Sequence, residues 1–192
     1  MTRIPEITRR EQLPEADRRH FDAIAAARGG QLTAPFRYLL YVPEMAARFA
    51  HLTAYTRHEA RGSALPDAIK ELAICATARA LDCRFEWADH EERALAAGIR
   101  PEAVTSIKTG SAPAGLTPDE AQVVAYVEQL LAAPHRVDDA TFAALRDRLG
   151  DTHLVELTAL IGMYSALACT FNAFEVAPTP GLPLLPERSR RD

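Results

Sequence analysis

Apolar residues recur along nearly the whole chain at intervals of three and four, which is the spacing of one face of an α-helix. Runs of strict apolar and polar alternation, which would indicate β-strands, are missing. Alanine is abundant, as high helix propensity and tight helix packing favour. The pattern therefore predicts an all-α fold.

Proline, glycine and capping residues divide this pattern into separate helices. The clearest start signal is Thr117-Pro118-Asp119-Glu120, which has the form of a capping box with proline at the first helical position. The last helix is apolar on most of its sides, so we expect the core or another subunit to bury it. The predicted helices cover residues 14–28, 36–42, 43 to about 61, 66–97, 101–109, 118 to about 133, 138–149 and 151–174.

Length and composition point to one helical domain. The chain has 192 residues, 48% of them hydrophobic and 25% charged, which is enough for one domain with its own core. We place this domain at residues 1–178. Residues 179–192 are rich in proline and then in charge, so we expect an extended or disordered tail.

Charge and cysteine content narrow the classes of function. A net charge of −4 gives no basic field for nucleic acid or for an anionic membrane surface, so neither is expected as a partner. No signal peptide or membrane span is recognisable, and we expect a cytoplasmic protein. The three cysteines lack CxxC spacing and the six histidines form no HExxH pair, so we expect neither disulfides nor a metal site.

Residues 71–98 carry the candidate chemistry. At about 100° per residue, the side chains of a continuous helix at positions 79, 83, 86 and 90 fall within roughly 60° of one another. An arginine, a cysteine, a glutamate and a histidine would then share one face: Arg79, Cys83, Glu86 and His90. A break at Asp82, a plausible N-cap, would instead put Cys83 at the start of a new helix, where the helix dipole favours a thiolate.

The spacing of these residues resembles that of the carboxymuconolactone decarboxylase family, which includes the alkylhydroperoxidase D-like proteins. In the peroxidase-like branch a Glu stands twelve residues before a CxxC pair, and a His follows the second Cys by four. Glu71, Cys83 and His90 keep this spacing, but Glu86 replaces the second cysteine. The resemblance extends more weakly over about residues 30–175. It implies an AhpD-like helical bundle that associates with itself as trimers or hexamers.

The glutamate at position 86, in place of the second cysteine, indicates which branch of the family the chain resembles. A peroxidatic cycle needs a dithiol that closes to a disulfide, and one thiol cannot close it. The decarboxylase branch has a Glu at this position, as here. The resemblance therefore favours a cofactor-independent lyase that acts on a small acidic molecule, such as an acidic lactone or another enolisable carboxylate, by general acid/base catalysis.

Each candidate residue has a functional and a structural interpretation. His90 suits proton transfer, with Glu86 one turn away to orient it. Arg79 would bind the anionic substrate through two parallel hydrogen bonds. Trp87 is either a pocket wall or a residue of the core or of a subunit interface, and the second interpretation is slightly favoured. Tyr164 on the last helix is a weaker candidate for substrate binding.

For Glu71 and Cys83 the sequence allows both a functional and a structural role. Glu71 lies about 80° from the direction of Arg79 on a straight helix, so a structural role is favoured unless the helix bends. Cys83 is as well explained by packing as by reactivity.

Three hypotheses for function remain. The leading one is the decarboxylase-type enzyme, whose site would serve isomerisation or lactone hydrolysis equally well. The second is an antioxidant enzyme that uses Cys83 alone, with an external thiol as resolving partner. The third is a non-catalytic helical oligomer that binds a small acidic ligand.

Overall fold

The computed structural model describes residues 2–57 and 63–186, and in these ranges the only regular secondary structure is helical. Two short 3₁₀ turns, Arg10–Gln12 and Glu15–Asp17, precede the first α-helix. The α-helices are α1 Arg18–Ala26, α2 Ala34–Leu39, α3 Pro43–Arg57, α4 Asp67–Ala80, α5 Arg84–Ala96, α6 Pro101–Thr109, α7 Pro118–Leu131 and α8 Asp139–Ala173. The all-α prediction is confirmed.

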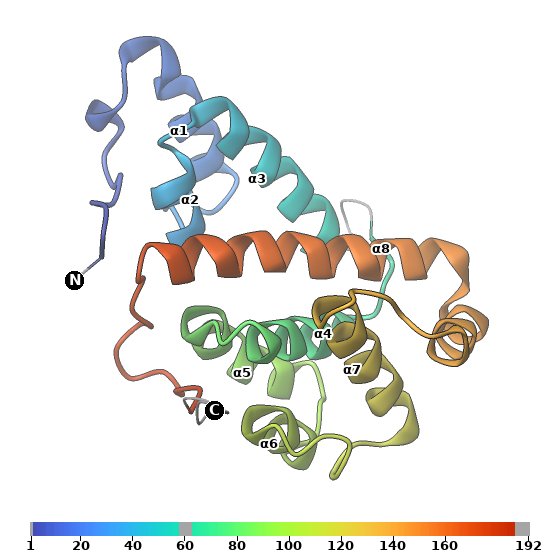
Figure 1. Ribbon diagram of the computed structural model, residues 1–192. Helices are drawn as coiled ribbons and strands as arrows, with labels where there is room; N and C mark the ends of the chain where they lie inside the picture. The colour runs from blue at the N-terminus through green and yellow to red at the C-terminus, as the bar shows by residue number, and fades with distance from the viewer. Residues whose placement is uncertain (1, 58–62, 187–192) are drawn as a thin grey trace.

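Helix α8 divides the molecule into two parts (Figure 1). Helices α1 to α3 lie on one side of it and α4 to α7 on the other. Each part has its own set of buried apolar residues: one centres on α4 to α7 and includes Trp87, and the other centres on α1 to α3 and includes Phe36 and Phe171. Because α8 is apolar around most of its circumference, it supplies residues to both sets.

The predicted capping residues lie at the helix ends. Thr117 accepts a hydrogen bond from the backbone nitrogen of Glu120 at 3.2 Å, and Glu120 accepts one from the backbone nitrogen of Thr117 at 2.7 Å. Asp138 caps α8 through the backbone nitrogen of Thr141 at 2.8 Å. At Gly150, φ is 73°, so the chain kinks there and joins the two helices that the sequence predicted.

The predicted central helix at 66–97 is two helices, which corrects the continuous alternative. Helix α4 ends at Ala80, and Asp82 takes a φ of 49°, in the left-handed region. Cys83, not Asp82, is the N-cap residue of α5. The chain therefore reverses between α4 and α5, which pack against each other, and positions 79 and 90 do not lie on one continuous helical face.

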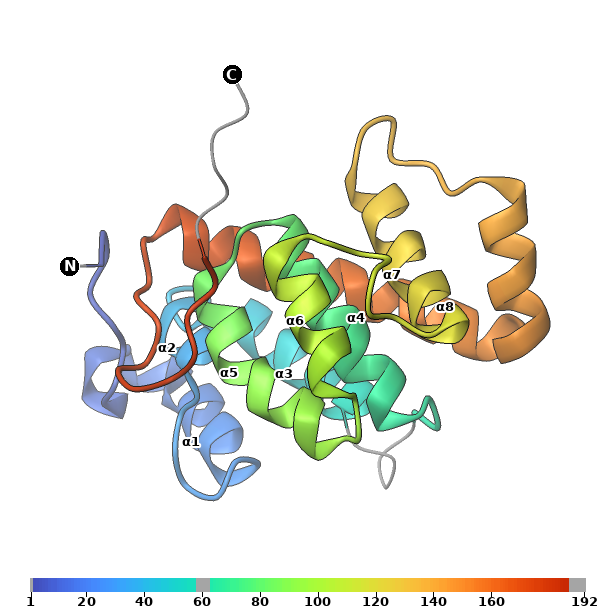
Figure 2. The ribbon, with the colours of Figure 1, turned by 90° about the horizontal axis from the view of Figure 1, so that it is seen from below.

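The segment that follows α8 has no regular secondary structure up to residue 186, and it packs against the body of the protein. It passes beside α5 in both ribbon views (Figures 1 and 2). Leu185 is 1% exposed and belongs to the same apolar set as Trp87. The Pro186 carbonyl accepts a hydrogen bond from Nη1 of Arg79 at 2.8 Å.

Helix α8 meets the length and hydropathy of a membrane-spanning helix, although no such segment stood out in the sequence. Its mean hydropathy reaches 1.6 over the most apolar window, and half of that window is buried within the structure. A helix in a protein core meets the same criteria, so this is weak support for a membrane span.

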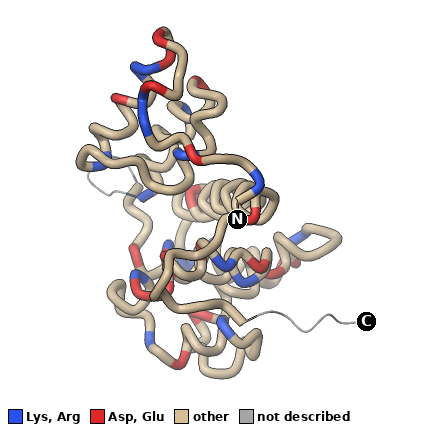
Figure 3. Tube along the Cα trace, turned by 90° about the vertical axis from the view of Figure 1, so that its left-hand side faces the viewer, with Lys and Arg blue, Asp and Glu red and all other residues tan. Residues whose placement is uncertain are grey.

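Basic and acidic residues are interspersed over the described trace (Figure 3).

Candidate active site

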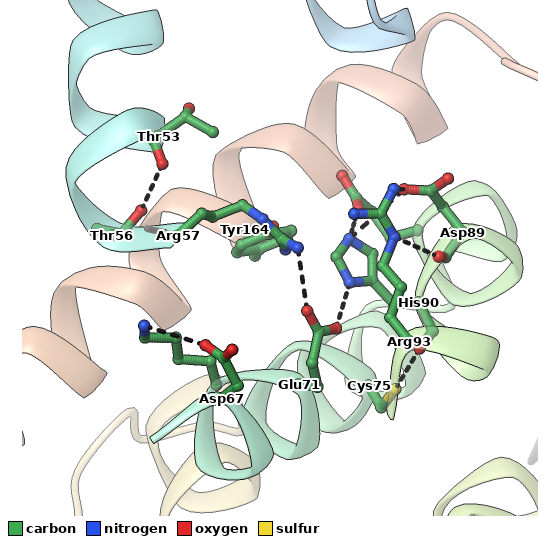
Figure 4. Close-up of polar contacts among 12 residues, drawn as sticks. Thr53, Thr56, Arg57, Asp67, Glu71, Cys75, Asp89, His90, Arg93 and Tyr164 are labelled. Atoms are coloured by element: carbon green, nitrogen blue, oxygen red, sulfur yellow. Dashed lines mark hydrogen bonds and ion pairs between the residues drawn. The ribbon is translucent and has the colours of Figure 1, made fainter. Parts of the chain in front are cut away.

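A buried histidine stands between two carboxylates where α4 and α5 pack together. Nδ1 of His90 lies 2.6 Å from Oε2 of Glu71 (Figure 4). Nε2 of His90 lies 3.4 Å from Oε2 of Glu86. His90, Glu71 and Glu86 are 3%, 7% and 4% exposed, respectively. Glu71 comes from α4, whereas Glu86 and His90 are one turn apart on α5. The reversal at Asp82 is what brings Glu71 to the histidine.

Helices α3 and α8 complete the polar cluster. Nη2 of Arg57 lies 3.0 Å from Oε1 of Glu71, and Nη1 of the same guanidinium donates to the Tyr164 hydroxyl at 2.5 Å (Figure 4). The ring of Tyr164 meets that of His90 edge to face, with centroids 5.2 Å apart. Four helices therefore hold one continuous network of charged and polar side chains.

The contacts in this network shift the pKa values of its members. Burial lowers the pKa of His90, but its hydrogen bonds to Glu71 and Glu86 outweigh burial and raise it above the ordinary value. Burial raises the pKa of Glu71, but His90 and the charge of Arg57 outweigh it and lower that pKa. Both shifts favour an imidazolium paired with a carboxylate at neutral pH.

The network borders a cavity of about 230 Å³. The cavity lies between the N-terminal helices and α5, against α8, and His90, Glu86, Arg57 and Tyr164 all line it. Phe36, Phe85 and Leu167 supply apolar wall, and three further charged residues also line it: Arg28, Asp89 and Arg93. A small molecule with an anionic group and an apolar part matches this lining.

One oxygen of Glu86 is available to a ligand. Oε1 of Glu86 is buried and has no hydrogen-bond partner among the described residues, although Glu86 lines the cavity. A buried carboxylate oxygen without a partner is costly, and a hydroxyl or N–H donor in the cavity would satisfy it.

Cys83 is placed in the core and not in the cavity. It is 0% exposed and packs in the apolar set of the N-terminal helices. Burial raises its pKa to about 12, which outweighs the lowering by backbone N–H groups at the start of α5. The helix start that was expected to favour a thiolate is present, but desolvation dominates it. The accessible thiol that a single-cysteine peroxidase requires is therefore absent at Cys83.

Arg79 and Trp87 lie away from the cavity. Arg79 is 7% exposed, and it contacts the C-terminal segment and Asp82, at 3.4 Å from Oδ1. Trp87 is 0% exposed in the core, where its indole nitrogen donates to Glu91 at 2.5 Å. The prediction that Arg79 shares a face with His90 is wrong because the helix breaks between them, and the core interpretation of Trp87 is correct.

The sequence does not mark Arg57 as a site residue, and it favours a structural role for Glu71. Arg57 lies on a helix without a recognisable motif, so only tertiary packing reveals its place in the network. Glu71 did have a signal, namely its spacing from Cys83 and His90 together with the possible break at Asp82. Tyr164 was a weak candidate on sequence grounds, and the structure places it beside His90.

Comparison with known proteins agrees with this architecture. Residues 43–129 match the model of the carboxymuconolactone decarboxylase family. No curated protein matches the chain. A crystal structure described as the alkylhydroperoxidase AhpD core, an uncharacterised peroxidase-related protein from Ralstonia eutropha JMP134, superposes with a TM-score of 0.73. That match covers 93% of each chain at 19% identity, which supports a shared fold.

The matched residues contain α4 and α5, and with them the Glu71, Glu86 and His90 cluster. Residues 43–129 thus match the carboxymuconolactone decarboxylase family, and the AhpD-like fold extends over nearly the whole chain.

Proposed function

We propose that the protein is a cofactor-independent enzyme of decarboxylase type, in which His90 delivers a proton to carbon. The observation that carries this proposal is the buried imidazole of His90, held on Nδ1 by Glu71 and presenting Nε2 toward Glu86 at the cavity. A histidine with one nitrogen fixed by a carboxylate has a defined tautomer and orientation, which general acid catalysis requires.

The reaction proceeds through an enolate. The bond between the substrate carbon and its carboxylate breaks, CO₂ leaves, and the electron pair passes into the adjacent carbonyl. Nε2–H of the imidazolium then gives its proton to that carbon, so one proton is consumed for each CO₂ released. Solvent returns the proton to His90. Glu71 keeps the imidazolium charged between turnovers because its carboxylate raises the pKa of His90.

Arginines that line the cavity, and not Arg79, bind the anionic substrate. Arg57 is linked to His90 through Glu71, and it donates to the hydroxyl oxygen of Tyr164, so the phenolic hydrogen is free to point to a developing oxyanion. Arg28 and Arg93 also line the cavity and bind the substrate carboxylate. Proton transfer is typically worth about 10²–10⁴-fold in rate, and these charges supply much of the remainder.

The antioxidant alternative has no support at the site. Its nucleophile would be Cys83, which is fully buried and whose pKa lies near 12. A thiol in that state forms almost no thiolate at neutral pH.

The test is a screen of β-keto acids and carboxylated lactones in D₂O. Decarboxylation releases CO₂ and places one deuterium on the product carbon, which NMR detects. Isomerisation or lactone hydrolysis would give deuterium exchange or ring opening without CO₂. We expect His90→Gln to lower turnover at least about 100-fold.

Two variants serve as controls. His51→Gln changes an exposed histidine on α3 and should leave the rate unchanged, and Cys83→Ser should retain activity. Equal turnover in His90→Gln and the parent protein would disprove the proposed role of His90. Binding of screened acids without turnover of any of them would favour a non-catalytic binding protein.

A further inference from the structure

A second cavity, of about 310 Å³, lies behind the catalytic network. It is bordered by α3, α4 and α5, with Leu160 of α8 as part of its apolar wall. Arg57 and Arg93 line both this cavity and the first one. Its other charged residues are Asp67, Lys70 and Glu71, all on α4.

Lys70 is the unusual member of this lining. It is 3% exposed, which is rare for lysine. Its ammonium group offers three hydrogen-bond donors, but the one contact found for it among the described residues is Oδ1 of Asp67, at 3.3 Å. The side chain of Asp67 is 67% exposed, so solvent screens the charge that it offers. A buried cation with so little compensation is costly.

The other carboxylates nearby are already engaged. Glu71 uses one oxygen for Arg57 and the other for His90. Asp89, in the first cavity, pairs with Arg93 at 3.0 Å. Taken over the described residues, the lining of the second cavity therefore has three cations and two carboxylates, and the surplus positive charge is at Lys70.

We propose that this second cavity binds a small oxyanion, a carboxylate or a phosphate, with the ammonium of Lys70 as its main contact. The oxyanion supplies the acceptors that Lys70 lacks, and Arg57 and Arg93 on the adjacent walls add to the attraction. The two cavities share Arg57 and Arg93, but Lys70 lines only the second one, and the proposal does not depend on the proposed reaction. Arg57 also binds Glu71, which in turn binds His90, so an anion in the second cavity affects the charge balance at His90.

The chain offers a direct measurement because it has two lysines, Lys70 and Lys108. Protein labelled with ¹³C-lysine gives one Cε resonance for each. Lys108 is an internal control, since it is held by Glu91 at 2.8 Å on another part of the surface. Sodium phosphate and sodium acetate are titrated in separate arms, with sodium chloride at matched ionic strength as reference.

We expect the Lys70 signal to shift and saturate with one of the two oxyanions while the Lys108 signal stays in place. The arm that saturates at lower concentration identifies phosphate or carboxylate as the preferred group. Lys70→Met should abolish the binding measured by calorimetry, and Lys70→Arg, which keeps the charge, should retain at least part of it. Circular dichroism checks that both variants are folded.

Two outcomes would overturn the proposal. One is a Lys70 signal that does not respond beyond the chloride reference. The other is a non-saturating drift of both lysine signals, which indicates general ionic screening. Neither result bears on the screen for decarboxylation, so failure of the oxyanion site and failure of the proposed function are distinguishable.

Discussion

Replacing Glu71 by glutamine tests whether the charge of this carboxylate holds the buried network together. The amide has nearly the same size and keeps an oxygen acceptor, but it removes the negative charge shared by Arg57 and His90 at 3.0 and 2.6 Å. Hydrogen bonds to charged groups contribute about 1.5–3 kcal/mol each. Removing one partner of a buried ion pair costs about 3–5 kcal/mol. Because the amide retains part of the bonding, we expect a loss near the lower end, about 3 kcal/mol.

The dependence on pH follows from the two shifted groups. The pKa of Glu71 is lowered by folding, so its contribution is present above the unfolded pKa and is lost as the pH falls through the folded value. The pKa of His90 is raised, so its contribution is present below the unfolded pKa, about 6.5, and is lost as the pH rises through the folded value. The difference between parent and Glu71→Gln should therefore be largest at mildly acidic pH and smaller on both sides. The pair with Arg57 keeps it above zero at alkaline pH.

The assay is urea unfolding between pH 4 and 9 at one fixed protomer concentration. A loss of about 3 kcal/mol corresponds to a fall in the thermal midpoint of about 6–12 °C for a chain of this size. Glu92→Gln is the matched control because Glu92 is exposed on the same helix as His90. If Glu71→Gln loses no more than this control, or if its deficit does not change with pH, the charged network is not what stabilises the site.

Three further outcomes are expected. Native protein should react with one equivalent of a thiol reagent at neutral pH, at exposed Cys169, because burial raises the pKa of Cys83 and Cys75. In urea all three cysteines should react. Rapid labelling of Cys83 in the native protein would contradict this expectation. Arg79→Met should speed proteolysis of the C-terminal segment without changing turnover in the screen, and a large rate loss would restore a role for Arg79 at the site. Light scattering should give the mass of a trimer or hexamer, as the family resemblance implies, whereas a monomer of 21.0 kDa would refute that expectation.

Helix positions and their ends were predictable from local signals. The capping box at Thr117 and Glu120, the cap at Asp138 and the stop at Gly150 depend on hydrogen bonds and backbone angles within a few residues. The spacing of Glu71, Cys83 and His90 likewise indicates the family whose model matches residues 43–129. These features are encoded in short stretches of chain, so they do not depend on how the helices pack.

The membership of the site was decided by the tertiary structure. The left-handed residue Asp82 reverses the chain, which carries Arg79 away from His90 and brings Glu71 to 2.6 Å from it. Packing of α3 and α8 then adds Arg57, which no local pattern marked, and Tyr164, which the sequence marked only weakly.

The tertiary structure also decided the pKa values of the site residues. The sequence by itself established an all-helical chain, most of its helix ends and a set of candidate residues that includes 71, 86 and 90. The desolvation that raises the pKa of Cys83, and the charges that raise that of His90, depend on which groups surround each side chain in three dimensions. Those neighbours come from helices far apart in the chain, so only the folded arrangement determines them.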